Sequence, residues 1–251
     1  MGKSKNKQDP LDTSMSLGDH LEELRARLIL AILGLVIGTI ICLFFGTRII
    51  TFIESPYNKL PTERPLVVLA PADAFIGYMK ISLIAGLLLS SPWVFYQLWM
   101  FISAGLYPHE KKYIHVAVPF SAFLFVAGAL FFLFVVAPIS LLFFLKFGQF
   151  IKVESNWTFQ KYISFMTTLM LVFGIGFQTP IAIFFLSRTG LVSIQALKKS
   201  RKYVLLGVFV VAAVATPPDV ISQITLAIPL YGLFELGILL GYLSGRKKKA
   251  Q

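Results

Sequence analysis

Long uninterrupted runs of apolar residues dominate this sequence and limit what it can fold into. The first run, Leu28–Phe45, contains no charged side chain. About 20 consecutive apolar residues in an α-helix cross the hydrocarbon core of a bilayer. Hydrophobic residues make up 57% of the chain and charged residues only 14%, and a water-soluble fold could not bury that much apolar surface. The sequence therefore predicts an all-α membrane protein.

Six apolar segments qualify as membrane-spanning helices. We expect them at Leu28–Phe45, Phe75–Phe101, Ile114–Val136, Tyr162–Leu186, Tyr203–Thr216 and Val220–Leu243. The fifth, at about 21 Å for a helical rise of 1.5 Å per residue, is short for a bilayer. Pro92 and Pro180 fall inside the second and fourth segments, where membrane helices tolerate proline as a kink. We therefore expect six kinked transmembrane helices that form a curved concave wall.

The segment between the first two spans is rich in proline. Its prolines are Pro56, Pro61, Pro65 and Pro71. Proline interrupts regular helices, and a connection of this length without structure of its own is uncommon. We expect a structured extracytoplasmic cap.

The distribution of Lys and Arg predicts the orientation. We divide the chain into a disordered tail at 1–15, a six-span membrane domain at 16–243 and a basic tail at 244–251. The two tails and the loops on their side hold most of the 23 Lys and Arg residues, which places this side in the cytoplasm. We expect a bacterial-type inner (plasma) membrane. The net charge of +11 then reflects topology and contact with anionic lipid, and not nucleic-acid binding.

Signatures of catalysis are missing from the sequence. Cys42 is the only cysteine, and His20, His109 and His115 are scattered along the chain. There is no glycine-rich phosphate loop and no serine-nucleophile or metalloprotease motif. We expect no enzyme activity, no cofactor and no metal.

Carboxylates are scarce on the basic side, where the acids after the first tail are Asp19, Glu22, Glu23 and Glu110. One interpretation is local pairing, of Glu23 with Arg27 at i,i+4 and of Glu110 with Lys111 or Lys112, as solvated charges of little energy. The other is a site in which two separate elements present acceptors to a cationic ligand. Spacing alone favours the local pairs.

Few polar side chains fall inside the spans. They are Gln97, Gln178, Gln223 and Glu235, with Asp219 in the turn before the last span. A carboxylate within a span is costly and suggests a function. Glu235 lies about 12 Å from the cytoplasmic end of its helix, so an interhelical hydrogen bond or snorkelling explains it equally well.

Several motifs together resemble one family. They are HLEELRAR at 20–27, SSP at 90–92, FI at 101–102 with GLYPHEKK at 105–112, TPPD at 216–219 with SQ at 222–223, and AIP at 227–229. In order and spacing they resemble TatC, the multi-spanning subunit of the twin-arginine protein translocase. The resemblance covers almost the whole chain after the first tail.

The resemblance implies a receptor. Such a protein binds the paired arginines of signal peptides on folded proteins and recruits the single-span subunits TatA and TatB into an oligomeric complex, with transport driven by the proton-motive force. By position, the arginine acceptors are Glu23 and Glu110, and the residues around them are Arg25, Arg27 and Phe101. Further positions that matter in the family are Pro56, Asp219 and Gln223.

The chain departs from the family pattern at two places. Ala104 stands where proline is frequent, which should only soften a turn. Gln178 stands where glutamate is common; the amide keeps hydrogen bonding but cannot titrate. Because an unpaired amide in lipid costs free energy, we expect Gln178 to face the concave side and to bond a polar residue of TatA or TatB.

Two other functions fit a six-span protein. A small secondary transporter or channel predicts internal repeats and an ion pathway of intramembrane charges, and the sequence has no clear repeat and mostly amides in its spans. A structural scaffold would make the cytoplasmic carboxylates replaceable.

Overall fold

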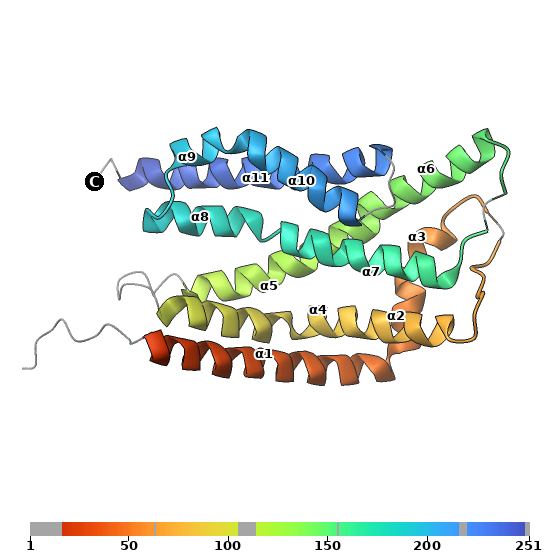
Figure 1. Cartoon of the computed structure of the whole chain (residues 1–251), viewed down its shortest axis with the longest axis horizontal. Helices are drawn as coiled ribbons and strands as arrows, with labels where there is room; N and C mark the ends of the chain where they lie inside the picture. The colour runs from red at the N-terminus through yellow and green to blue at the C-terminus, as the bar shows by residue number, and fades with distance from the viewer. Residues whose placement is uncertain (1–16, 63, 105–113, 155, 216–219, 249–251) are drawn as a thin grey trace, which may run out of the picture.

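The computed structural model describes residues 17–248 except 63, 105–113, 155 and 216–219, and the described part is helical (Figure 1). The first half contains α1 (Leu17–Phe44), α2 (Gly46–Ile53), α3 (Ser55–Asn58), α4 (Asp73–Ala104) and α5 (Ile114–Phe131). The second half contains a π-helical turn (Phe132–Val136), α6 (Ala137–Phe150), α7 (Phe159–Gly176), α8 (Thr179–Thr189), α9 (Ile194–Lys199), α10 (Arg201–Ala215) and α11 (Val220–Lys248).

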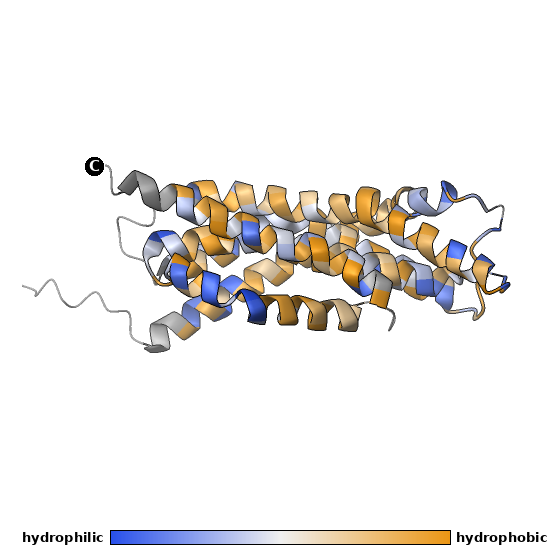
Figure 2. Ribbon diagram, turned by 90° about the horizontal axis from the view of Figure 1, so that it is seen from above, coloured by the Kyte–Doolittle hydropathy of each residue, from blue (hydrophilic) through white to orange (hydrophobic). Residues whose placement is uncertain are grey.

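Five stretches of the described helices are long and apolar enough to cross a membrane. They are Leu21–Phe44, Asp73–Ser103, His115–Phe150, Phe159–Thr189 and Gln223–Leu243. The remaining predicted span is α10, which has 15 residues and a length of about 22 Å. Apolar residues occupy the middle of the bundle and hydrophilic residues its two ends (Figure 2). The chain is a multi-pass membrane protein whose α10 is too short to cross an unperturbed bilayer.

Three predicted helix boundaries differ from the structure. The third span does not end at Val136 but continues to Phe150. Pro138 lacks an N–H for the preceding turn, and a π turn at Phe132–Val136 accommodates it without ending the helix. The fourth span is two helices, α7 and α8, separated at Phe177 and Gln178 just before Pro180.

The third difference is at the end of the last helix. Helix α11 continues to Lys248, into the segment that we assigned to the basic tail. The predicted tail at 1–15 lies outside the described residues.

Small residues let neighbouring helices approach closely. Helices α1 and α4 run side by side (Figure 1). A methyl group on Gly38 would lie 2.7 Å from the carbonyl oxygen of Gly86, and one on Gly86 would lie 2.6 Å from the backbone of Thr39. Such backbone contacts are typical of helix packing in membranes, where the hydrophobic effect does not drive association. The pair α1 and α4 is therefore one rigid edge of the bundle.

The remaining helices continue from this edge. Helix α4 packs on α5 and α7, and α8 and α10 both pack on α11. Arg201 at the start of α10 forms an ion pair of 2.7 Å with Glu235 of α11, and the Tyr231 hydroxyl donates to the same carboxylate at 2.9 Å. Of the two explanations left open for Glu235, the structure supports an interhelical contact.

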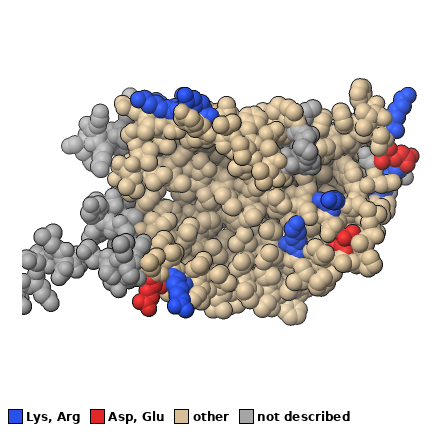
Figure 3. Space-filling model, viewed as in Figure 1, with Lys and Arg blue, Asp and Glu red and all other residues tan. Residues whose placement is uncertain are grey.

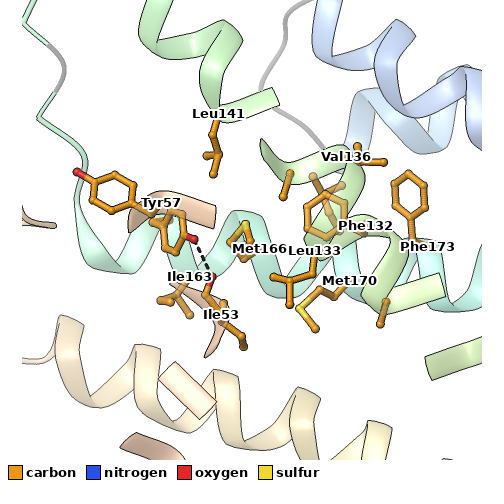
Figure 4. Packing of buried hydrophobic residues seen from close by; sticks show 14 of the residues in the cluster. Ile53, Tyr57, Phe132, Leu133, Val136, Leu141, Ile163, Met166, Met170 and Phe173 are labelled. Carbon is orange, nitrogen blue, oxygen red and sulfur yellow. Dashed lines mark hydrogen bonds between the residues drawn. The ribbon is translucent and has the colours of Figure 1, made fainter. Parts of the chain in front are cut away.

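The connection between α1 and α4 is the structured cap that the prolines predict. Helices α2 and α3 bring Ile53 and Tyr57 onto α7, where the buried Tyr162 hydroxyl donates to the Ile53 carbonyl at 2.8 Å (Figure 4). Val67 pairs with Thr158 in an isolated β-bridge. Outside the spans, Arg64 forms an ion pair of 3.0 Å with Glu154, and this bond lowers the pKa of the Glu154 carboxyl.

We predict that the bond from Tyr162 stabilises the cap on the bundle. Replacing Tyr162 by Phe leaves a buried carbonyl without this donor, which should lower the free energy of unfolding by about 1–3 kcal/mol. Unfolding of the detergent-solubilised protein, followed by circular dichroism, measures this change. Tyr203→Phe is the control because Tyr203 is 66% exposed. Equal stability of the two variants would contradict the assignment.

Candidate functional site

The start of α1 carries the carboxylate that we expect to bind a cationic ligand. Glu23 and Arg27 lie one helical turn apart, and the Arg27 guanidinium is 3.5 Å from a Glu23 carboxylate oxygen. About a quarter of each side chain is exposed, 24% for Glu23 and 26% for Arg27. The local pair predicted by the spacing is therefore present. It is a long and solvent-accessible contact, of the kind that contributes at most about 1 kcal/mol.

A second contact ties this pair to the neighbouring helix. Arg27 also donates to the side-chain oxygen of Gln97 on α4, at 3.3 Å. Gln97 is 2% exposed, so its amide is fixed within the bundle. The guanidinium is thus held by both helices and orients the Glu23 carboxylate near the end of the α1–α4 edge. The only signal for Gln97 in the sequence is an amide within an apolar run, and nothing there connects it with Glu23.

The structure describes some, but not all, of the other residues of the predicted peptide site. Phe101 lies one turn beyond Gln97 on α4 and is half-buried. Arg25 is exposed on α1. Glu110 lies outside the described residues, so the structure does not test whether its carboxylate approaches Glu23.

Gln178 occupies the break between α7 and α8. Its side-chain nitrogen donates to the backbone carbonyl of Ser121 on α5, at 3.1 Å. The hydroxyl of Ser121 accepts a bond of 2.9 Å from the indole N–H of Trp99 on α4. These polar contacts join α4, α5 and the break between α7 and α8, where the fourth span is interrupted. The Gln178 amide thus bonds a residue of its own chain, and we did not predict this partner.

The remaining predicted positions lie elsewhere in the fold. The side-chain nitrogen of Gln223 donates to the Phe209 carbonyl at 2.9 Å and so joins α11 to α10. Pro56 is buried at the start of α3 in the cap, at the opposite end of the bundle from Glu23 (Figure 1). Asp219 lies outside the described residues. Those of the predicted residues that the structure describes thus form several separate groups and not one cavity.

On the face seen in Figure 3, charged side chains lie in the left and right parts of the molecule, with an uncharged zone between them. Within the described residues no group of three or more His, Cys, Asp or Glu side chains could hold a metal ion. At the Glu23 end, the structure offers a carboxylate and a guanidinium, both partly exposed.

Comparisons with known proteins agree with this architecture. The family model of the Sec-independent protein translocase protein (TatC) matches residues 19–229. A TatC from Aquifex aeolicus is 38% identical over 236 residues, which cover 94% of this chain and 98% of the relative. The Escherichia coli TatC is 35% identical over 229 residues, which cover 91% of this chain and 88% of that relative.

A solved structure has the same fold. The crystal structure described as the twin arginine translocase receptor TatC superimposes with a TM-score of 0.82 at 37% identity, over 90% of this chain and 99% of that one. Sequence motifs, helix order and three-dimensional structure thus lead to one conclusion. The chain belongs to the TatC family and is a subunit of the twin-arginine protein translocase.

Proposed function

We propose that this chain is the receptor subunit that binds the paired arginines of signal peptides, with Glu23 and Glu110 as the acceptors. The observation that carries the proposal is the Glu23 carboxylate at the end of the α1–α4 edge, oriented by an arginine that Gln97 anchors. The solved relative described as a twin arginine translocase receptor supports the same role.

The chemistry of Glu23 suits this ligand. An ionised carboxylate has two oxygens and about four acceptor positions, and Arg27 approaches only one of the oxygens. A peptide guanidinium that binds with two parallel charge-assisted bonds would be held more strongly than Arg27 at 3.5 Å. Two adjacent arginines need two acceptors, and Glu110 is the second.

The basic surroundings add selectivity. Arg25 and Arg27 stand beside Glu23 on α1, and their charges repel cationic peptides in general. Only a ligand whose arginines reach both carboxylates overcomes this repulsion, which makes the site selective for paired arginines. Phe101 provides an apolar contact next to the pair.

Recruitment of the single-span subunits TatA and TatB is the second part of the proposal. The positions concerned are Gln178, Gln223, Asp219 and Pro56. Gln178 uses one N–H of its amide for Ser121, and an amide has two donors and an acceptor. We expect its other amide groups to bond a polar residue in a partner helix. Proton-motive force drives transport through the assembled complex.

We expect the two termini in the cytoplasm of a bacterial-type inner membrane. The excess of Lys and Arg in the tails and in the loops on their side supports this orientation. The peptide site at the start of α1 then faces the compartment in which signal peptides are made.

The peptide site is tested by replacing its acceptors. A charge-assisted hydrogen bond is worth about 1.5–3 kcal/mol, so Glu23→Gln and Glu110→Gln should each weaken binding of a twin-arginine peptide by about tenfold to a hundredfold. Affinity is measured for purified protein in one membrane mimetic. Glu22→Gln is the matched control, because Glu22 is the exposed neighbour of Glu23 on α1, and it should bind like the wild type.

One result would overturn this site. If a correctly inserted double variant, Glu23→Gln with Glu110→Gln, keeps its affinity for the peptide, the carboxylates belong only to local pairs. A twin-lysine peptide should bind poorly to every form of the protein.

The contact with the single-span subunits is tested at Gln178. Gln178→Leu removes all the hydrogen-bonding groups, and we expect site-directed crosslinks from α8 to TatA or TatB to fall several-fold. Gln149→Leu, which replaces an exposed amide on α6, should leave them unchanged. Normal crosslinking and transport by Gln178→Leu would count against the contact.

The orientation is tested by labelling single cysteines in a Cys42→Ser background. Cysteines at Ser4, Ser200 and Gln251 should react with an impermeant reagent only from the cytoplasmic side, and one at Thr62 in the cap only from outside. Reaction of the Thr62 position from the cytoplasm would exclude the six-span arrangement.

A further inference from the structure

An apolar groove runs along the bundle between α5, α8 and α11. Its volume is about 620 Å³, and its walls include Trp99 of α4, Phe120 and Phe123 of α5, Phe184 of α8 and Leu236 of α11. Phe120 and Phe123 are 53% and 67% exposed, so the groove is open along its side. The residues that line it are all apolar.

The groove belongs to the part of the chain that crosses the membrane. Its walls come from the apolar stretches Asp73–Ser103, His115–Phe150, Phe159–Thr189 and Gln223–Leu243. An opening there faces hydrocarbon and not water, and its size is within the 300–1,000 Å³ typical of ligand sites. Its occupant is therefore an apolar group.

The shape of the walls favours a flexible chain over a partner helix. Helices that pack closely in membranes need small residues at the interface so that their backbones can approach, as Gly38 and Gly86 do between α1 and α4. The walls of this groove are instead mostly Phe and Leu. Bulky side chains keep a helix backbone at a distance, whereas an acyl chain fits between them.

A cation lies on the same helix face as the groove. Phe177, Ile181 and Phe184 line the groove, and Arg188 continues this stripe one turn further along α8. The end of α8 lies at the same end of the bundle as the start of α1 (Figure 1). A guanidinium has five N–H donors and matches the geometry of phosphate, and basic sites between membrane helices on the cytoplasmic side bind anionic headgroups.

We infer that this groove binds one anionic phospholipid, with an acyl chain between α5, α8 and α11 and the headgroup phosphate at Arg188. The site is separate from Glu23 and does not depend on the proposed peptide binding. Its chemistry requires a phosphodiester with a net negative charge, so phosphatidylglycerol should bind better than phosphatidylcholine.

The fluorescence of the Trp99 indole reports directly on an acyl chain in the groove. In a background with Trp93→Phe and Trp157→Phe, Trp99 is the only tryptophan. Phosphatidylglycerol with brominated acyl chains, added to the detergent-solubilised protein, should quench its fluorescence at lower concentration than brominated phosphatidylcholine does. Arg188→Gln should raise the phosphatidylglycerol concentration for half-quenching by about tenfold, the effect of losing one charged hydrogen bond.

Two further variants complete the test. Lys198→Gln is the matched control. The Lys198 ammonium lies 5.5 Å from the ring of Tyr242, and Tyr242 points away from the groove because it is about 200° around α11 from the groove residue Leu240. This variant should not shift the titration. Ala127→Phe fills the groove from α5 and should abolish the quenching while the circular dichroism spectrum stays unchanged.

Three results would overturn the inference. They are the same midpoint for the two lipids, no shift in Arg188→Gln, and no quenching of Trp99 at all. If Trp99 is shielded only when a single-span subunit is added, the occupant is a helix and the lipid assignment is wrong.

Discussion

In hydrocarbon, a polar group must find its partner inside the protein, and this constraint shapes the whole bundle. The spans therefore meet at a few polar contacts, which include those of Arg27 with Gln97, Gln178 with Ser121, and Gln223 with Phe209. Each of these contacts joins two different helices. The same contacts that satisfy buried amides also fix the positions of the residues assigned to function.

Much of the fold follows from the sequence because long apolar runs have few alternatives. The runs predict the spans, and the prolines predict the cap. The predicted boundaries differ from the structure at two prolines. The π turn before Pro138 lets the third helix continue to Phe150, whereas the fourth span is divided into α7 and α8 just before Pro180. At the site, the pair of Glu23 and Arg27 follows from i,i+4 spacing, whereas the bond from Arg27 to Gln97 joins residues 70 positions apart and has no local signal.

The two ends of the molecule are built differently. At one end, α1 and α4 present Glu23 above a helix pair locked by Gly38 and Gly86. At the other end, the Tyr162 hydroxyl and neighbouring contacts hold the cap on α7. Gln178 lies between them at a helix break, where an amide bonds Ser121 without a titratable proton. The hydrogen bond at this helix break is therefore neutral.

We propose that a twin-arginine peptide docks at the start of α1, and distances within the complex distinguish this end of the bundle from the cap. A spin label on the peptide beside its arginines, measured by pulsed electron resonance against a label at Leu21 or at Thr62, distinguishes the two ends of the bundle. We predict a short distance to Leu21, which is exposed on α1, and a long distance to Thr62 in the cap. A short distance to Thr62 and a long one to Leu21 would contradict the account.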